Sequence, residues 1–227
     1  MNHSTRAPKV ALSAPPDPPA HDPEAFDGTP TWKVVRTLRD GTPITIRPIS
    51  AEDREGLRRA FRETSANTRY LRFLGSVGEL SDKMLTYLTE VDQHDHLALV
   101  ATMTSPDLKV ERGIGVARVI RLEHGGDVAE AAITVADDMQ RRGVGSTLAH
   151  EVEAAARARG IRTIRAEILE SNSGMRAILE STGARCVEPR EGTGTLSYDI
   201  AIEPPHGSAS RTIALLRGAA QTMLRRR

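Results

Sequence analysis

The chain has 227 residues, which suits one domain with tails or at most two small domains. Apolar residues make up 39% of the sequence but aromatic residues only 3%, so a core must rest on Leu, Ile, Val and Ala. The formal net charge of +1 does not favour a nucleic acid or a membrane surface as partner. The single cysteine, Cys186, excludes an internal disulfide and a cysteine metal cluster, and we expect it in the core.

Both ends of the chain differ in composition from the middle. Residues 1–30 are polar and rich in proline, which predicts a disordered tail. Residues 204–227 predict a linker followed by a basic amphipathic segment, which could dock on the domain or on a second subunit. The folded domain is therefore expected over residues 31–203. The apolar runs are far shorter than a membrane span and the N-terminus lacks an apolar signal core, so we expect a cytoplasmic protein.

The first half of the domain predicts strands followed by helices. The stretches 32–38 and 42–49 are strand-like, and the dipeptide Asp40-Gly41 between them is a strong hairpin signal. Ser50 and Ser81 each predict the N-terminal cap of a helix. The residues between these two helices, 64–74, are interpreted as a link.

The second half alternates strands and helices. Three strands are expected at about 96–103, 113–122 and 128–135, as an antiparallel meander. A helix over about 143–159, a strand over 161–169, a helix over 173–181 that ends at Gly183, and a last hairpin over 185–187 and 195–202 follow. This order predicts an α/β (α+β) fold with a mostly antiparallel sheet of about seven strands and with about four helices.

The turn Gln140–Gly145 stands between a predicted strand and a predicted helix. Such a turn presents backbone N–H groups at the positive end of the helix dipole, where phosphate binds. Gly143 and Gly145 allow an anion to approach the backbone, and Arg141 and Arg142 add charge. The pattern is neither a Walker loop nor the dinucleotide fingerprint.

This turn, the strand before it and the order of the elements resemble the GNAT superfamily of acetyl-CoA-dependent N-acetyltransferases. The pyrophosphate loop of that superfamily reads Gln/Arg-x-x-Gly-x-Gly/Ala. Three stretches are similar to bacterial Pat-type protein lysine acetyltransferases: LRDGTPITIRPI, SANTRYLRFL and AEAAITVADDMQRRGVG. The similarity covers about residues 32–202. It implies the GNAT fold, acetyl-CoA as cosubstrate and no metal.

The resemblance also implies where the cosubstrate binds. The pantetheine arm would lie between two splayed strands, bonded to the backbone of Ile133, Thr134 and Val135. Asn172 occupies the position of a common pantetheine contact, but it is equally suited to cap a helix, and both roles are compatible. The pyrophosphate would sit on the amides of Gln140, Arg141, Arg142, Gly143, Val144, Gly145 and Ser146.

Glu130 is the candidate general base. Acetyl transfer needs a neutral amine, and a lysine with a pKa near ~10.4 is almost fully protonated at neutral pH. Glu130 lies in an otherwise apolar strand, where a carboxylate needs a reason, and the resemblance gives it the position of the base in Pat-type enzymes. The alternative is an exposed residue at the start of a strand. Many superfamily members use a Tyr as general acid, and Leu179 stands at that position here.

Three functional hypotheses remain open at this point. The first is acetylation of a protein lysine ε-amine by direct attack, with Glu130 as the base. The second keeps the enzyme but replaces the acceptor with a small amine such as a polyamine, an aminoglycoside or an amino acid. The third is an acyl-CoA-binding sensor without catalysis. An oligomer is possible in each case.

Overall fold

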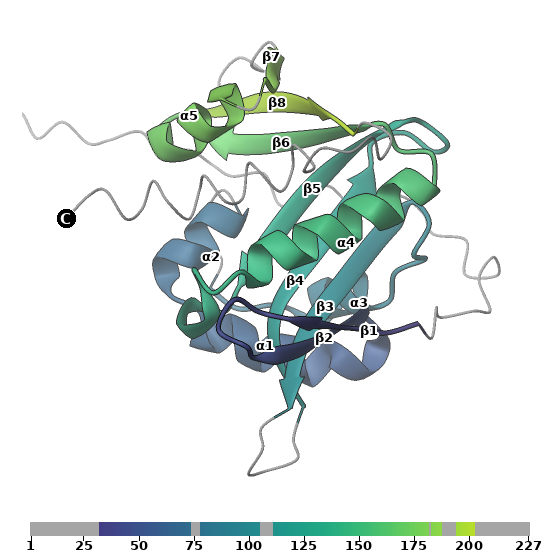
Figure 1. The fold of residues 1–227 in the computed structure, drawn as a ribbon, viewed down its shortest axis with the longest axis vertical. Helices are drawn as coiled ribbons and strands as arrows, with labels where there is room; N and C mark the ends of the chain where they lie inside the picture. Colours follow the sequence, from purple (N-terminus) through teal and green to yellow (C-terminus); the bar gives the residue numbers. More distant parts are fainter. Residues whose placement is uncertain (1–31, 74–77, 105–110, 182, 188–193, 203–227) are drawn as a thin grey trace, which may run out of the picture.

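The computed structural model describes residues 32–73, 78–104, 111–181, 183–187 and 194–202. The expected tails, 1–30 and 204–227, lie outside the described residues. Figure 1 shows the described elements. They are β1 (Val34–Thr37), β2 (Pro43–Pro48), the short 3-10 helix η1 (Ala51–Asp53), α1 (Arg54–Glu63), α2 (Ala66–Phe73), α3 (Asp82–Thr89), β3 (His96–Thr104), β4 (Glu111–Arg121), β5 (Val128–Val135), the 3-10 helix η2 (Asp137–Met139), α4 (Val144–Ala158), β6 (Thr163–Leu169), α5 (Ser173–Ser181), β7 (Arg185–Val187) and β8 (Thr195–Ala201).

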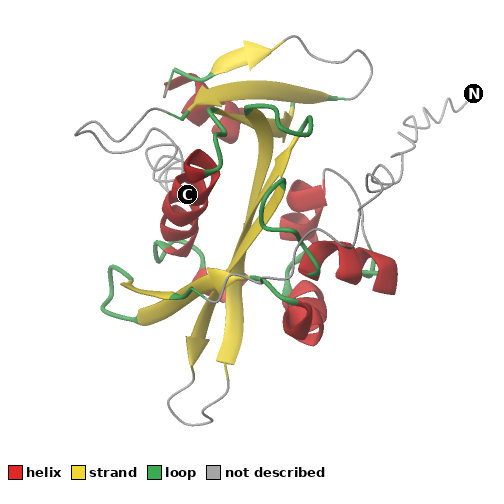
Figure 2. Cartoon of the chain, turned by 90° about the vertical axis from the view of Figure 1, so that its right-hand side faces the viewer, coloured by secondary structure: helices red, strands yellow, loops and turns green. Residues whose placement is uncertain are grey.

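The described strands form one sheet of eight strands in the order β1-β2-β3-β4-β5-β6-β8-β7. Neighbouring strands run antiparallel except β5 and β6, which are parallel. The mixed, mostly antiparallel fold expected from the sequence is therefore confirmed, with eight strands where about seven were expected. Helix α4 lies on one side of the sheet and α1, α2 and α3 lie on the other (Figure 2).

Local signals explain where several elements begin and end. Asp40-Gly41 forms the expected hairpin turn, with Gly41 at a φ of 86° and its N–H bonded to the Leu38 carbonyl. The Ser81 hydroxyl accepts the Met84 N–H at 3.2 Å and so caps α3. Gly183 takes a φ of 75° just after α5, a conformation that favours glycine.

Two expectations about the chain are wrong. Residues 66–73 form helix α2, although the sequence predicts only a link there. The Ser65 hydroxyl accepts the Thr68 N–H at 3.2 Å, so a cap was present in the sequence. Cys186 is exposed and does not belong to the core. It lies in β7, a three-residue strand at the edge of the sheet, where little covers a side chain.

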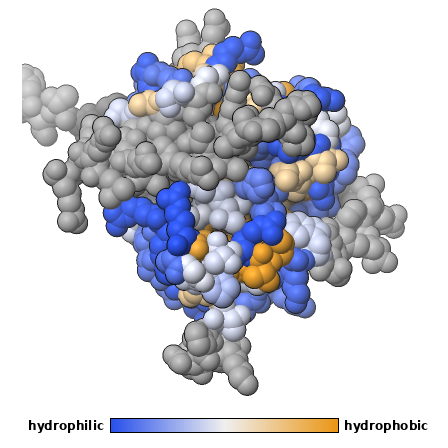
Figure 3. All heavy atoms as spheres, in the orientation of Figure 1, coloured by the Kyte–Doolittle hydropathy of each residue, from blue (hydrophilic) through white to orange (hydrophobic). Residues whose placement is uncertain are grey.

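The main core lies between the sheet and α4. It is built from aliphatic residues, as the low aromatic content requires, and it includes Leu148, Val152 and Ala156 from α4. A smaller cluster joins α1 to α3 on the other face through Phe61 and Leu85. The surface seen from the side of α4 is mostly hydrophilic where it is described, with an apolar patch over β1 (Figure 3).

Leu148 tests whether the α4 interface carries the stability of the fold. Its side chain is 0% exposed, so Leu148→Ala leaves a cavity, and we expect the free energy of unfolding to fall by about 2–5 kcal/mol. Val35 on β1 is 62% exposed, so Val35→Ala should change that free energy by less than about 0.5 kcal/mol. Urea denaturation of both variants checks this. Equal effects would contradict the assignment of the core.

Candidate active site

The strands β5 and β6 part after only three paired residues. Val128, Ala129 and Glu130 pair with residues 163–165, and no later residue of β5 pairs with β6. Both strands nevertheless continue, β5 to Val135 and β6 to Leu169. Figure 1 shows the two ribbons diverging from this point. A wedge-shaped gap therefore opens in the sheet, and Glu130 stands at its apex.

The backbone of β5 offers hydrogen-bonding groups to this gap. Ala136 donates its N–H to the carbonyl of Ile114 in β4 at 3.0 Å. Because bonded and non-bonded pairs alternate along antiparallel strands, the N–H and C=O groups of Ala131, Ile133 and Val135 point away from β4. They point into the gap. An extended ligand placed there can add to β5 as another strand would.

Beyond β5 the chain forms a row of bare backbone amides. The N–H groups of residues 141–146 have no hydrogen-bond acceptor among the described residues. Arg141 and Gly143 take positive φ values of 63° and 102°, and this backbone curls the amides into a concave nest at the start of α4. The nest and the N-terminus of α4 together attract an anion. This geometry fits a pyrophosphate group.

Gln140 and Asp137 fix the loop to helix α2. The Gln140 Nε2 donates to the Val135 carbonyl at 3.2 Å and to the Asp137 carboxylate at 2.9 Å. The same carboxylate accepts the Ser65 N–H at 2.6 Å and the Thr68 hydroxyl at 2.8 Å. The Gln140 side chain therefore shapes the loop. Asp137 was not singled out from the sequence, because its partners lie 72 and 69 residues away.

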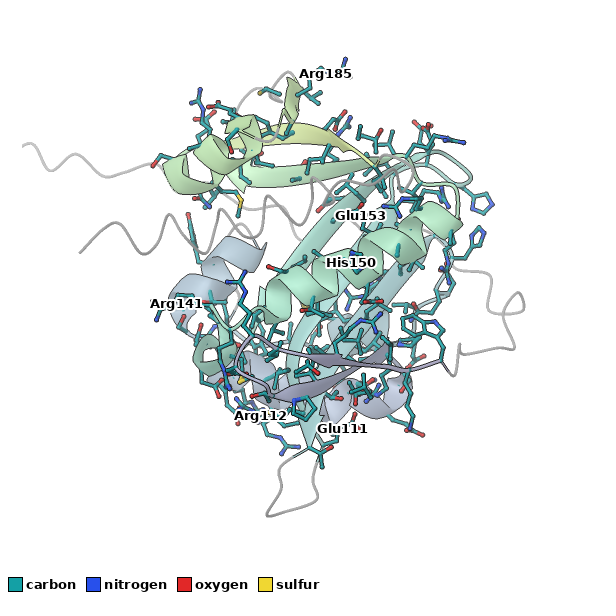
Figure 4. All side chains as sticks on the ribbon, in the orientation of Figure 1. Glu111, Arg112, Arg141, His150, Glu153 and Arg185 are labelled. Carbon is teal, nitrogen blue, oxygen red and sulfur yellow. The ribbon has the colours of Figure 1, made fainter. Side chains whose placement is uncertain are left out.

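The side chains of Arg141 and Arg142 have different surroundings. The Arg142 guanidinium binds the Asp40 carboxylate, with Nε at 2.8 Å from Oδ2, so its side chain ties the loop to the β1–β2 turn. The Arg141 side chain is exposed beside the start of α4 (Figure 4) and makes no recorded contact within the described part of the chain. Of the two side chains, only that of Arg141 is placed to meet an anion, while both backbone amides face the nest.

Glu130 points to the face of the sheet that α1, α2 and α3 cover. Side chains alternate along a strand, and Ala132 and Thr134 on the same face line a cavity of about 390 Å³. The cavity lies between α1 and the sheet, and Leu57 of α1 lines its other wall. Buried Arg118 of β4 stands beside Ala132 and forms the end of the cavity nearest Glu130.

Asn172 and Leu179 both have structural roles in the fold. The Asn172 Oδ1 accepts the Met175 N–H at 3.1 Å, so the cap of α5 is confirmed, and its Nδ2 makes no recorded contact with a described residue. Leu179 is 2% exposed and belongs to the main core. No described group of three or more His, Cys, Asp or Glu residues is arranged to hold a metal ion.

Known proteins resemble this chain in sequence and in fold. Residues 44–185 match the family described as Acetyltransferase (GNAT) domain. Acetyltransferase Pat of Mycolicibacterium smegmatis is 34% identical over 167 residues, which are 74% of this chain and 48% of that protein. Acetyltransferase PA5475 of Pseudomonas aeruginosa is 33% identical over 149 residues, 66% of this chain and 78% of that protein. The crystal structure of the GNAT domain of S. lividans PAT superposes with a TM-score of 0.65 at 32% identity, and covers 75% of this chain and 97% of that one.

The chain belongs to the GNAT acetyltransferase family. The matched domain is therefore an acetyltransferase domain, with acetyl-CoA as its cosubstrate. The chain spans about half the length of the Pat relative that it matches. Within its described residues, no helix has the length and apolar content needed to cross a membrane.

The anchor between Asp40 and Arg142 predicts a pH dependence. Hydrogen bonds from the Thr42 side chain and backbone, and then from Arg142, lower the pKa of Asp40 to about 2. A carboxyl with a lowered folded-state pKa stabilises the fold above its unfolded pKa of ~3.9, and this contribution is lost as the pH falls through about 2. We expect the difference in unfolding free energy between the native chain and Asp40→Asn to be constant from about pH 5 to 8 and to shrink below about pH 4. Urea denaturation at several pH values measures it. A difference that already shrinks between about pH 7 and 5 would contradict this account.

Proposed function

We propose that this GNAT acetyltransferase transfers the acetyl group from acetyl-CoA to protein lysine ε-amines by direct attack, with Glu130 as general base. The observation that carries the proposal is the place of Glu130. It stands at the apex of the gap, beside the cavity under α1, so a donor in the gap and an acceptor in the cavity would meet at its carboxylate.

The donor would enter the gap from the side of the nest. We propose that the amides of residues 141–146 bind its pyrophosphate, and that the pantetheine arm then follows β5 towards Glu130. The backbone groups of Ile133 and Val135 face the arm, although the Val135 carbonyl also accepts Gln140. The backbone of Thr134 pairs with β4 and its side chain lines the cavity, so Thr134 is not assigned to the pantetheine arm. The Nδ2 of Asn172 is the group that this residue could offer to the arm.

The reaction removes two protons from the acceptor ammonium, one before the attack and one as the amide forms. In the proposed mechanism the Glu130 carboxylate takes a proton from the lysine ammonium, directly or through water, and the neutral amine attacks the thioester carbonyl carbon. The C–S bond then breaks, the nitrogen loses its second proton to solvent as the amide forms, and the CoA thiolate leaves. Leu179 offers no proton to that thiolate. A thiol has an ordinary pKa of ~8.5, so a thiolate leaves at neutral pH without a side-chain acid.

The acceptor is proposed from the resemblance to Pat-type enzymes and from the lining of the cavity. The lining carries the carboxylates of Glu52, Asp53, Glu55 and Glu111 together with the guanidiniums of Arg47, Arg59 and Arg118. Asp53 is paired with Arg47 at 2.8 Å. A site for a small polycation needs carboxylates that remain unpaired. This mixed lining supports a lysine on a protein surface over a polyamine or an aminoglycoside.

A comparison of acceptors tests the proposal. The full chain is incubated with acetyl-CoA and, in separate reactions, with a lysine-containing peptide, spermidine or kanamycin, and products are identified by mass spectrometry. We expect acetyl-lysine in the peptide. Acetylation of a small amine alone would replace the proposed acceptor, and binding of acetyl-CoA without any product would favour an acyl-CoA sensor.

Glu130→Gln tests the proposed base. The amide keeps the shape of the side chain but cannot take the proton, so we expect kcat to fall by at least about 100-fold. The Kd of acetyl-CoA, measured by calorimetry, should stay within about twofold, because the base contacts the acceptor and not the pyrophosphate. The control is Glu123→Gln in the exposed β4–β5 turn, which should leave both values unchanged. A comparable loss of acetyl-CoA affinity in Glu130→Gln would make Glu130 a structural residue.

Gly143→Val tests the proposed nest. Gly143 has a φ of 102°, which strains any other residue, and strain of about 1–3 kcal/mol would distort the row of amides. We expect the Kd of acetyl-CoA to rise on the order of tenfold or more. Gly160→Val is the matched control, because Gly160 has a φ of 80° at the opposite end of α4. Normal affinity in Gly143→Val, or equal losses in both variants, would contradict the assignment.

A further inference from the structure

The turn between β1 and β2 lies beside the amide nest at the start of α4 (Figure 1). The Arg142 guanidinium holds it there, because Nε bonds to Asp40 Oδ2 at 2.8 Å and Nη2 bonds to the Thr42 hydroxyl at 3.1 Å. The turn also closes on itself, with the Leu38 N–H bonded to the Thr42 carbonyl at 2.9 Å. Leu38 is 4% exposed and belongs to the main core. The backbone of the turn is therefore fixed on both sides of residue 39.

Arg39 extends from this turn past Gly143. The Arg39 Cγ lies 3.9 Å from the point that a Cβ on Gly143 would occupy. Chain neighbours aside, no other heavy atom of the described residues is recorded within 4 Å of that point. The Arg39 side chain is exposed and makes no recorded hydrogen bond or ion pair within the described part of the chain. A fixed backbone thus carries a guanidinium that is not committed to any described group.

The charges around the nest favour an anion. The negative charge of Asp40 is balanced by Arg142. The Asp137 carboxylate is turned to α2, where it accepts hydrogen bonds from the first residues of that helix and its cap. Arg39 on the turn and Arg141 on the loop (Figure 4) have no ion-pair partner among the described residues. Two uncompensated positive charges therefore flank the row of backbone amides.

We propose that Arg39 is a further cosubstrate-binding residue, whose guanidinium binds a phosphate group of acetyl-CoA at the nest. The inference rests on the proposed placement of the pyrophosphate on the amides of residues 141–146. Acetyl-CoA carries a pyrophosphate and a separate 3′-phosphate, and backbone amides have no formal charge to balance them. A guanidinium donates two parallel N–H groups to one phosphate, and such charge-assisted hydrogen bonds are stronger than those between neutral groups. Because the backbone of the turn is already fixed, only the side chain of Arg39 must be ordered on binding.

Calorimetric titration of the full chain with acetyl-CoA, without an acceptor, tests the inference. Arg39→Met keeps the apolar stem and removes the guanidinium, so we expect the Kd to rise about fivefold or more at low ionic strength. The rise should shrink as salt is added, because exposed charges are screened. Arg39→Lys retains the charge without the paired N–H donors and should lose less affinity. The unfolding temperature should not change in either variant, since the side chain is exposed.

Lys33→Met is the matched control. It removes an exposed positive charge from the same hairpin, next to the opposite end of β1, and should leave the Kd of acetyl-CoA within about twofold of the native value. A second ligand then identifies the phosphate. Acetyl-dephospho-CoA lacks the 3′-phosphate but keeps the pyrophosphate. An equal loss with both ligands in Arg39→Met assigns the guanidinium to the pyrophosphate, and a loss confined to acetyl-CoA assigns it to the 3′-phosphate.

Two results would overturn the inference. One is a Kd of acetyl-CoA in folded Arg39→Met that stays within twofold of the native value. The other is an equal loss in Lys33→Met, which would reduce the effect to the net charge of the chain. Gly143→Val separates this failure from that of the proposed nest. If Gly143→Val loses affinity and Arg39→Met does not, only the role of Arg39 fails, and if neither loses affinity, the placement of the pyrophosphate fails with it.

Discussion

The parting of β5 and β6 is the constraint on which the rest of the site depends. Backbone N–H and C=O groups must be paired or solvated, and a central strand rarely leaves one edge open. Here β5 keeps β4 on one side and, beyond Glu130, pairs with no strand of the described residues on the other. The opening ends where the amide nest begins, at the start of α4. A ligand bound along the open edge of β5 and at the nest would accept and donate hydrogen bonds to both sets of backbone groups at once.

A single carboxylate, that of Asp137, connects the loop before α4 to the start of helix α2. Asp137 accepts hydrogen bonds from Ser65 and Thr68 at the start of α2 and from Gln140 in the loop. Helix α2 and the loop therefore cannot take independent positions. Arg142 extends the same scaffold to the β1–β2 turn through Asp40. The loop is held in place through the side chains of Asp137, Gln140 and Arg142. Its backbone amides are not used for this purpose and can meet a ligand.

Most of the fold could be predicted from local sequence signals. The features that were not predicted depend on contacts between residues far apart in the chain. Gly183 and Ser81 act within one helical turn, so their positions at helix ends could be read directly from the sequence. The Asp40–Arg142 pair joins residues 102 positions apart, and no periodicity reveals it. Glu130 was proposed as the base from a resemblance and from its unusual place as a carboxylate in an apolar strand, and this role stays a prediction. The alignment of Glu130 with Arg165 and of Arg165 with Asp199 depends on the register of three strands, which the sequence pattern does not specify.

Because Leu179 cannot act as an acid, the proposed reaction depends mainly on the base. A thiolate leaves readily, whereas a lysine ammonium must lose a proton before it can attack. The adjacent strand places the Arg165 guanidinium at the same level as Glu130. That guanidinium pairs with Asp199 one strand further out, with its Nε 2.8 Å from Asp199 Oδ1. The positive charge of Arg165 is therefore balanced within its own part of the sheet.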